Sequence, residues 1–104
     1  MYVSVVYDLS NDDTVKKVKD ILVFYRFKEV LKDVFESESI QENTLKKLKR
    51  DIDRIADHFD RVRFYQYSND HQFVISFLEK KRWKKVLLKW GKIIYVTGLS
   101  GFIK

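Results

Sequence analysis

Asp8 is the residue of this sequence that is best placed to do chemistry. It closes a run of β-branched and aromatic residues that starts at Met1 and contains no Gly or Pro. Such a run is typical of a strand that is apolar on both faces and lies in the middle of a sheet. A carboxylate at the end of this strand would lie at the mouth of the core, where it could hold a metal ion. The alternative is that Asp8 starts a turn or caps the next helix, which is a common role for Asp.

Mg²⁺ is the metal ion that a carboxylate of this kind would bind. Mg²⁺ prefers oxygen ligands and keeps several waters, so one or two carboxylates can suffice. Asp8 alone is a poor metal site. A homodimer whose twofold axis brings Asp8 next to Asp8 of the partner subunit would make a better metal site. The metal could then orient a water or stabilise the leaving oxygen of a phosphodiester. Asp8 is therefore our candidate catalytic residue and metal ligand, with Mg²⁺ as the cofactor.

Other catalytic constellations do not occur in the sequence. His58 and His71 do not stand at ligand spacing, and structural roles are the simpler interpretation of both. The chain has no Cys, which excludes disulfides and thiolate metal sites. The patterns HExxH, GxSxG, Walker A and GxGxxG are also missing.

Positive charge is concentrated in the last part of the chain. Residues 1–60 carry 11 Lys/Arg against 13 Asp/Glu, a net charge of −2, whereas residues 61–104 carry 10 against 2, a net charge of +8. This asymmetry favours a surface that faces a polyanion, and an ordinary solvated basic surface is the alternative. The candidate phosphate-binding residues here are Lys80, Lys81, Arg82, Lys84 and Lys85. Trp83 and Trp90 lie among them and either stack on bases or, as tryptophans in strands more often do, belong to the core or an interface.

The composition indicates one small globular domain. The chain has 104 residues, of which 45% are hydrophobic and 35% charged. No apolar stretch approaches the ~18–20 residues that span a membrane, and no signal peptide is visible. Together with the absence of Cys, this leads us to expect a cytoplasmic protein that does not bind a membrane.

Four segments show a clear periodicity in the spacing of their apolar residues. Apolar runs predict strands over Tyr2–Leu9 and Arg61–Tyr67. Helical spacing predicts a helix over Asp12–Tyr25 and a second helix whose apolar stripe runs over Leu45–Phe59.

The other segments are harder to assign. Phe27–Ser37 fits both a helical period and a strand alternation, so a continued helix and a strand are both open. Polar residues before Asp70 predict a short helix over about Asp70–Lys80. Val86–Trp90 and Lys92–Thr97 are predicted to be two further strands around Gly91.

This order predicts an α+β fold of the ferredoxin-like type, with both helices on one face of an antiparallel sheet. The uncovered face would carry alternate residues of the first strand. These are either the set that includes Val6 and Asp8 or the set that includes Val5 and Tyr7. Both sets are too apolar to face water, so we expect a second copy of the chain to cover this face.

Several short segments together resemble one protein family. Tyr2–Leu9 (YVSVVYDL) resembles the strand ending in Tyr-Asp that opens the CRISPR-associated protein two family, the partner of the CRISPR integrase. Asp33–Glu36 (DVFE) is similar to that family's Ser-Val-Phe-Glu/Met strand. Thr44–Ile55 followed by Arg61–Tyr65 resembles its second helix and third strand in order and spacing. The similarity covers about residues 1–67.

The resemblance implies a ferredoxin-like βαββαβ domain over residues 1–104 that forms a homodimer with its sheets face to face. It implies a strand near residues 29–37, and a C-terminal segment at about 91–104 that could pair with the partner protomer. Among metal ligands, only Asp8 matches the family motif. Lys16, Lys17 and Lys19 stand where relatives commonly carry arginines, and we add Lys16 and Lys17 to the candidate nucleic-acid-binding residues. Residues 68–104 depart from the family pattern.

The leading hypothesis is a CRISPR adaptation protein that acts in spacer acquisition. The resemblance implies Mg²⁺-dependent endonuclease activity on RNA or double-stranded DNA. The alternatives are a non-catalytic DNA-binding bridge for the CRISPR integrase, and a toxin-type ribonuclease of the virulence-associated protein D group.

Overall fold

The computed structural model describes residues 1–68, 72–89 and 92–97. In chain order its elements are β1 (Tyr2–Asp8), α1 (Asp12–Phe24), β2 (Lys28–Leu31), β3 (Val34–Ser37), α2 (Glu42–Ile55), β4 (Arg61–Tyr67), β5 (Gln72–Glu79), β6 (Arg82–Lys89) and β7 (Lys92–Thr97). In this part of the chain, neither helix is long and apolar enough to cross a membrane.

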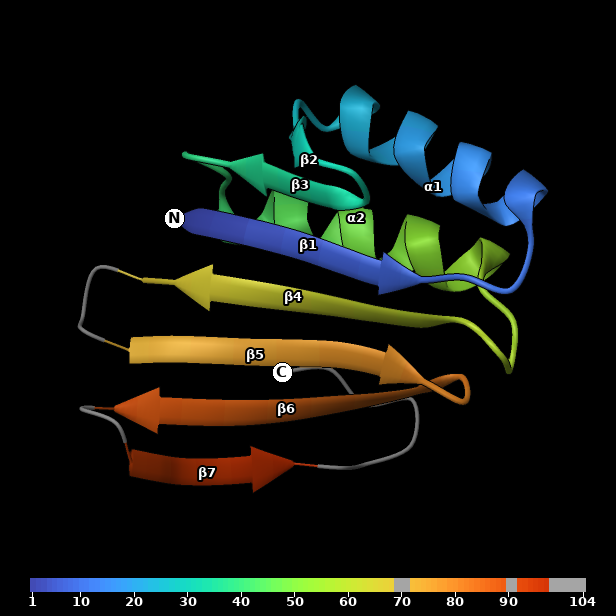
Figure 1. Ribbon diagram of the computed structural model, residues 1–104. Helices are drawn as coiled ribbons and strands as arrows, with labels where there is room; N and C mark the ends of the chain where they lie inside the picture. Colours follow the sequence, from blue (N-terminus) through green and yellow to red (C-terminus); the bar gives the residue numbers. More distant parts are fainter. Residues whose placement is uncertain (69–71, 90–91, 98–104) are drawn as a thin grey trace.

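All the strands belong to one antiparallel sheet with the order β2-β3-β1-β4-β5-β6-β7 (Figure 1). β1 is central and pairs with β3 on one side and β4 on the other. The first six elements form the predicted ferredoxin-like βαββαβ unit. β5, β6 and β7 then extend the sheet beyond β4 as a meander. The α+β prediction is therefore confirmed.

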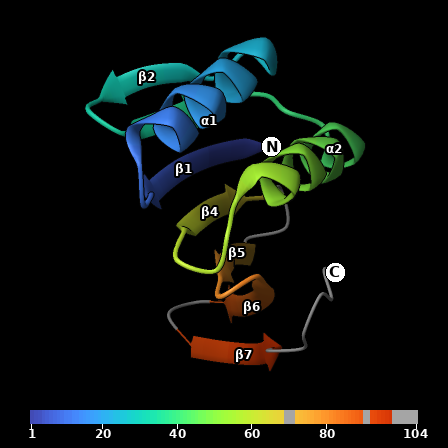
Figure 2. The same cartoon turned by 90° about the vertical axis from the view of Figure 1, so that its right-hand side faces the viewer.

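Both helices lie on one side of the sheet, over its ferredoxin-like part (Figure 2). α1 begins where the Asn11 side chain accepts a hydrogen bond from the Thr14 N–H at 2.8 Å, which satisfies one of the free amides of the first turn. Val18 and Leu22 of α1 are fully buried. The buried residues of α2 include Leu45, Leu48 and Ile52, and both helices pack on Val3, Val5, Val62 and Phe64 of the sheet.

The segment predicted as one strand near residues 29–37 is a hairpin of two strands. β2 and β3 are antiparallel neighbours, and Asp33 between them has a left-handed φ of 62°. Its N–H donates to the Glu29 carboxylate at 3.0 Å, which stabilises the turn. A strand cannot continue through a left-handed residue, so the alternation that the sequence shows is divided at Asp33.

The predicted helix over residues 70–80 is wrong, because Gln72–Glu79 forms β5. The spacing of Phe73 and Phe77 fits one helix face, but it fits one face of a strand as well. The strand prevails because its alternate residues Ser76 and Leu78 are buried on the helix side of the sheet. β6 also begins four residues before the predicted strand start at Val86.

Candidate metal and nucleic-acid site

Asp8 lies on the face of the sheet that the helices leave uncovered, which we call the open face. Val3, Val5 and Tyr7 of β1 are buried on the helix side, so Val6 and Asp8 point to the open face. This decides between the two sets of residues that the sequence left open. Side chains in register with them on neighbouring strands share that face. The open face comprises Tyr2, Ser4, Val6, Asp8, Val34, Glu36, Arg61, Arg63, Tyr65, Tyr67, Phe73, Ile75, Phe77, Glu79, Arg82, Lys84, Val86 and Leu88.

The open face changes character from one end to the other. At one end Asp8, Arg61, Glu79 and Arg82 are in register across four strands, which makes a row of alternating charge. At the other end the rings of Tyr2, Tyr67 and Phe73 contact one another, with centroids 6.4 and 4.5 Å apart for the two successive pairs. Between them Arg63 lies over the Phe77 ring, 4.7 Å from its centroid. The face therefore offers apolar surface for a partner and places Asp8 at its polar end.

Asp8 forms an ion pair with Arg61, its register partner on β4. An Arg61 Nη2–H donates to Asp8 Oδ2 at 2.5 Å, and the hydrogen bond raises the pKa of Arg61. The two side chains are 70% and 60% exposed. An ion pair in this much water is weak, so a cation that competes for the carboxylate can replace the guanidinium.

A pocket of about 190 Å³ adjoins this pair. It is lined by Val6, Tyr7, Asp8, Arg61, Val62, Arg63, Phe77, Leu78 and Glu79. Asp8 supplies carboxylate oxygens there, which is the donor chemistry that Mg²⁺ prefers. Within the described residues no cluster of three or more His, Cys, Asp or Glu could hold a metal. Asp8 and Glu79 are the two carboxylates that line this pocket, so one chain offers Mg²⁺ fewer than three such ligands here.

Asp60 holds together the two loops that flank the site. Its side chain is fully buried and accepts hydrogen bonds from the N–H of Ser10 at 2.7 Å and of Asp57 at 2.8 Å. Burial would raise its pKa, but these hydrogen bonds to the charged form lower the pKa overall. Ser10 lies two residues after Asp8, and Asp60 directly precedes Arg61, so Asp60 fixes the chain on both sides of the ion pair. The sequence does not distinguish Asp60 from its neighbours Asp53 and Asp57.

The seven candidate nucleic-acid-binding residues do not form one patch. Lys16 and Lys17 are exposed on α1. Arg82 and Lys84 are on the open face, whereas Lys85 is in register with Ser76 and points to the helix side. Lys80 is exposed in the β5–β6 turn.

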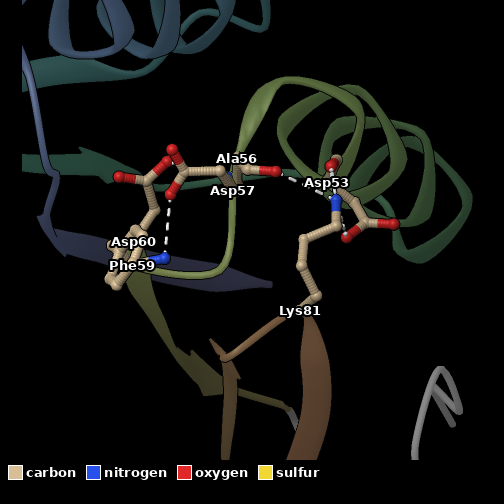
Figure 3. Close-up of polar contacts among 6 residues, drawn as sticks. All are labelled: Asp53, Ala56, Asp57, Phe59, Asp60 and Lys81. Atoms are coloured by element: carbon tan, nitrogen blue, oxygen red, sulfur yellow. Dashed lines mark hydrogen bonds and ion pairs between the residues drawn. The ribbon is translucent and has the colours of Figure 1, made fainter.

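Lys81, the remaining candidate, contacts the C-terminal end of α2 (Figure 3). Its ammonium donates to the backbone carbonyls of Asp53 at 2.5 Å and Ala56 at 3.0 Å, and it pairs with the Asp53 carboxylate at 3.3 Å. Lys80 and Lys81 have left-handed φ angles of 54° and 59°, which turn the chain sharply between β5 and β6. Lys81 therefore has a structural role that its position in a basic run did not indicate.

Lys49 is a buried cation that the sequence analysis missed. It is 3% exposed, donates to Gln66 Oε1 at 2.9 Å and lies 5.4 Å from the centroid of the Phe64 ring. Within the described residues no carboxylate pairs with it. Desolvation, followed by repulsion from Lys85, lowers its pKa to about 7. The sequence signal was present, because Lys49 follows Leu48 and precedes Ile52 at helical spacing.

Trp83 belongs to the core, as the simpler interpretation of the tryptophans predicted. It is 3% exposed, and its ring contacts Phe64 with centroids 5.8 Å apart. Its indole N–H is buried with no hydrogen-bond partner among the described residues. Trp90 and His71 lie outside the described residues.

The fold and the position of Asp8 define a ferredoxin-like protein with an exposed carboxylate at the end of its first strand. The family model for CRISPR associated protein Cas2 matches residues 1–75, and the chain belongs to this family. It is therefore a CRISPR adaptation protein. The match ends within β5, so β6 and β7 lie outside it. No curated protein and no solved structure matches the chain.

Proposed function

We propose that this protein acts as a homodimer that binds nucleic acid and hydrolyses phosphodiester bonds through Mg²⁺ held by Asp8 of both copies. The observation that carries the proposal is the position of Asp8, exposed at the polar end of a largely apolar face. A twofold axis that passes close to this polar end would bring Asp8 close to Asp8 of the partner subunit. The nucleic acid and the CRISPR integrase are the proposed partners.

The chain's own residues would divide the work at this site. Asp8 would hold the metal, which when bound would polarise the phosphate and lower the pKa of a bound water. Arg61 would leave the carboxylate and turn toward the phosphate, because a guanidinium binds phosphate oxygens in the same way as carboxylate oxygens. Arg63 and Lys84, one register pair further along the open face, would neutralise neighbouring phosphates.

A non-catalytic DNA-binding subunit for the integrase is the second candidate. The Asp8–Arg61 ion pair favours it, because the carboxylate already has a cationic partner without a metal. In this case the alternating charge row would help two copies to dock in register, and Asp8 would have no chemical role.

The nuclease activity of Asp8→Asn distinguishes the two candidates. Wild type and variant are incubated with RNA and with double-stranded DNA, in Mg²⁺ and in excess chelator. The proposal predicts cleavage by wild type in Mg²⁺ alone, and a loss of about a hundredfold or more in Asp8→Asn, because a neutral amide binds Mg²⁺ poorly. Asp20→Asn, the same substitution at an exposed position on α1 outside the proposed site, is the matched control and should retain cleavage. Equal activity of wild type and Asp8→Asn would remove Asp8 from the chemistry and favour the non-catalytic role.

A further inference from the structure

Phe59 is an exposed aromatic residue next to the Asp8 site. The sequence places it on the apolar stripe of α2, but the helix ends at Ile55 and Phe59 lies in the α2–β4 turn, 77% exposed. A single exposed apolar side chain is common on protein surfaces and needs no explanation by itself.

The turn that carries Phe59 is held by several hydrogen bonds. The Phe59 N–H donates to Asp57 Oδ1 at 2.8 Å, and the Asp57 N–H donates to the carboxylate of the fully buried Asp60 at 2.8 Å (Figure 3). The Asp60 N–H donates in turn to the Asp57 carbonyl at 3.2 Å. These bonds fix the backbone of Phe59, so a ligand that contacts the ring does not have to order the loop first.

Phe59 lines a pocket whose other walls are polar or charged. The pocket has a volume of about 260 Å³ and is formed by His58, Phe59, Arg61, Glu79 and Lys80. Lys80 is exposed there, and within the described residues it has no ion pair. The adjacent Lys81 ties the β5–β6 turn to α2 and so fixes the wall to which Lys80 belongs. The volume lies below the ~300–1,000 Å³ of sites for drug-sized ligands, which suits a single planar ring.

This pocket is a neighbour of the pocket at Asp8. Arg61 and Glu79 line both pockets. A ring that lies on Phe59 would therefore have its attached phosphate near Arg61 or Lys80, and the next phosphodiester near Asp8. The charge of Glu79 opposes a phosphate in the pocket itself, which is why the pocket suits the uncharged base better than the backbone.

We propose that Phe59 is a stacking platform for an unpaired nucleobase, which positions the adjoining phosphodiester at Asp8. The proposal rests on the proposed nucleic-acid binding and adds that the ligand has a single-stranded end. An aromatic ring stacks on any base, so the site would select unpaired structure and not sequence.

The test compares probes with and without unpaired bases. The probes are short duplexes of DNA and of RNA, either blunt or with a single-stranded overhang that contains 2-aminopurine, whose fluorescence falls when it stacks. The variants are Phe59→Ala and Phe59→Trp. The matched control is Phe24→Ala, because Phe24 is 78% exposed on α1 and lines none of the pockets described here.

The proposal predicts that Phe59→Ala weakens binding of the overhang probes about fivefold or more and abolishes the fluorescence loss. Phe59→Trp should retain both, Phe24→Ala should match wild type, and binding of the blunt probes should change little. Because Phe59 is exposed, its truncation should not affect folding, which the melting temperature checks.

Two results would contradict the proposal in different ways. If wild type binds the probes and Phe59→Ala binds them equally well, Phe59 is not a platform and the proposed function is unaffected. If wild type binds none of the probes, the proposed nucleic-acid binding fails and the platform fails with it.

Discussion

At the scale of single residues, three charged side chains differ in how deeply they are buried and in how their charge is compensated. Asp8 is exposed, and among the described residues Arg61 is its one ion-pair partner, so it is free to exchange partners. Asp60 is fully buried but receives two backbone hydrogen bonds, which compensate its charge. Lys49 is buried with one neutral hydrogen-bond partner, Gln66, and its charge is therefore the most costly of the three.

The low pKa of Lys49 predicts a pH-dependent stability. The folded protein releases this proton near pH 7, whereas the unfolded chain keeps it until about pH 10.5. The unfolded state thus binds more protons between these values, so the free energy of unfolding rises with pH, by up to about 1.4 kcal/mol per pH unit. Above pH 10 the raised pKa values of Tyr2 and Tyr25 act in the opposite direction, because the folded state then holds more protons.

Urea unfolding of wild type and Lys49→Met measures this effect between about pH 6 and about pH 10. This range begins below the pKa of Lys49 in the folded protein, about 7, and ends near its pKa in the unfolded chain, 10.5. The variant should lack the rise and should be more stable than wild type at the acidic end, because a buried unpaired charge is replaced by an apolar side chain of similar size. Parallel curves for the two proteins would show that Lys49 does not titrate in this range.

At the scale of elements, the sequence predicted those with a strong local signal. β1, β4 and the two helices have clear periods, and α1 has a capping residue in Asn11. β5 was mistaken for a helix because Phe73 and Phe77 fit both periods and no Gly or Pro marks its end. The turn at Lys80 and Lys81 takes left-handed angles without Gly or Asn, and no local rule predicts that.

The candidate site was predicted only in part, because only some of its features follow from a local sequence pattern. Asp8 was identified because its strand is a local pattern. Its pairing with Arg61 depends on the register of two strands far apart in the chain, and the roles of Asp60 and Lys81 depend on how loops pack. None of these can be derived from local spacing.

The contact between Lys81 and α2 predicts a stability effect for this turn. Lys81→Met removes a cation from the negative end of the α2 dipole and two hydrogen bonds to its last carbonyls, and should cost about 1 kcal/mol. Lys80→Met is the control, since Lys80 is exposed in the same turn, and should change the free energy of unfolding little. Urea denaturation gives both values. Equal values for the two variants would show that the contact adds no stability.

At the scale of the whole molecule, the sheet is covered unevenly. The helices bury one side of its ferredoxin-like part, and β5, β6 and β7 enlarge the open face with apolar residues such as Phe73 and Ile75. Val6 and Tyr67 on this face are 37% and 55% exposed. Burial of such a face by a second copy would stabilise the protein by the hydrophobic effect. A dimer would thus bring together two Asp8 carboxylates, each of which is a weak metal ligand alone.

The separation of the two copies of residue 8 tests this central claim most directly. The chain has no Cys, so Asp8→Cys provides one unique position for a spin label in each protomer. The account predicts a dimer in sedimentation and strong dipolar broadening of the label's spectrum, whereas a label at Phe24→Cys on the helix side should show none. A monomer, or a dimer in which only the Phe24→Cys labels interact, would contradict the pairing of Asp8 across the open face.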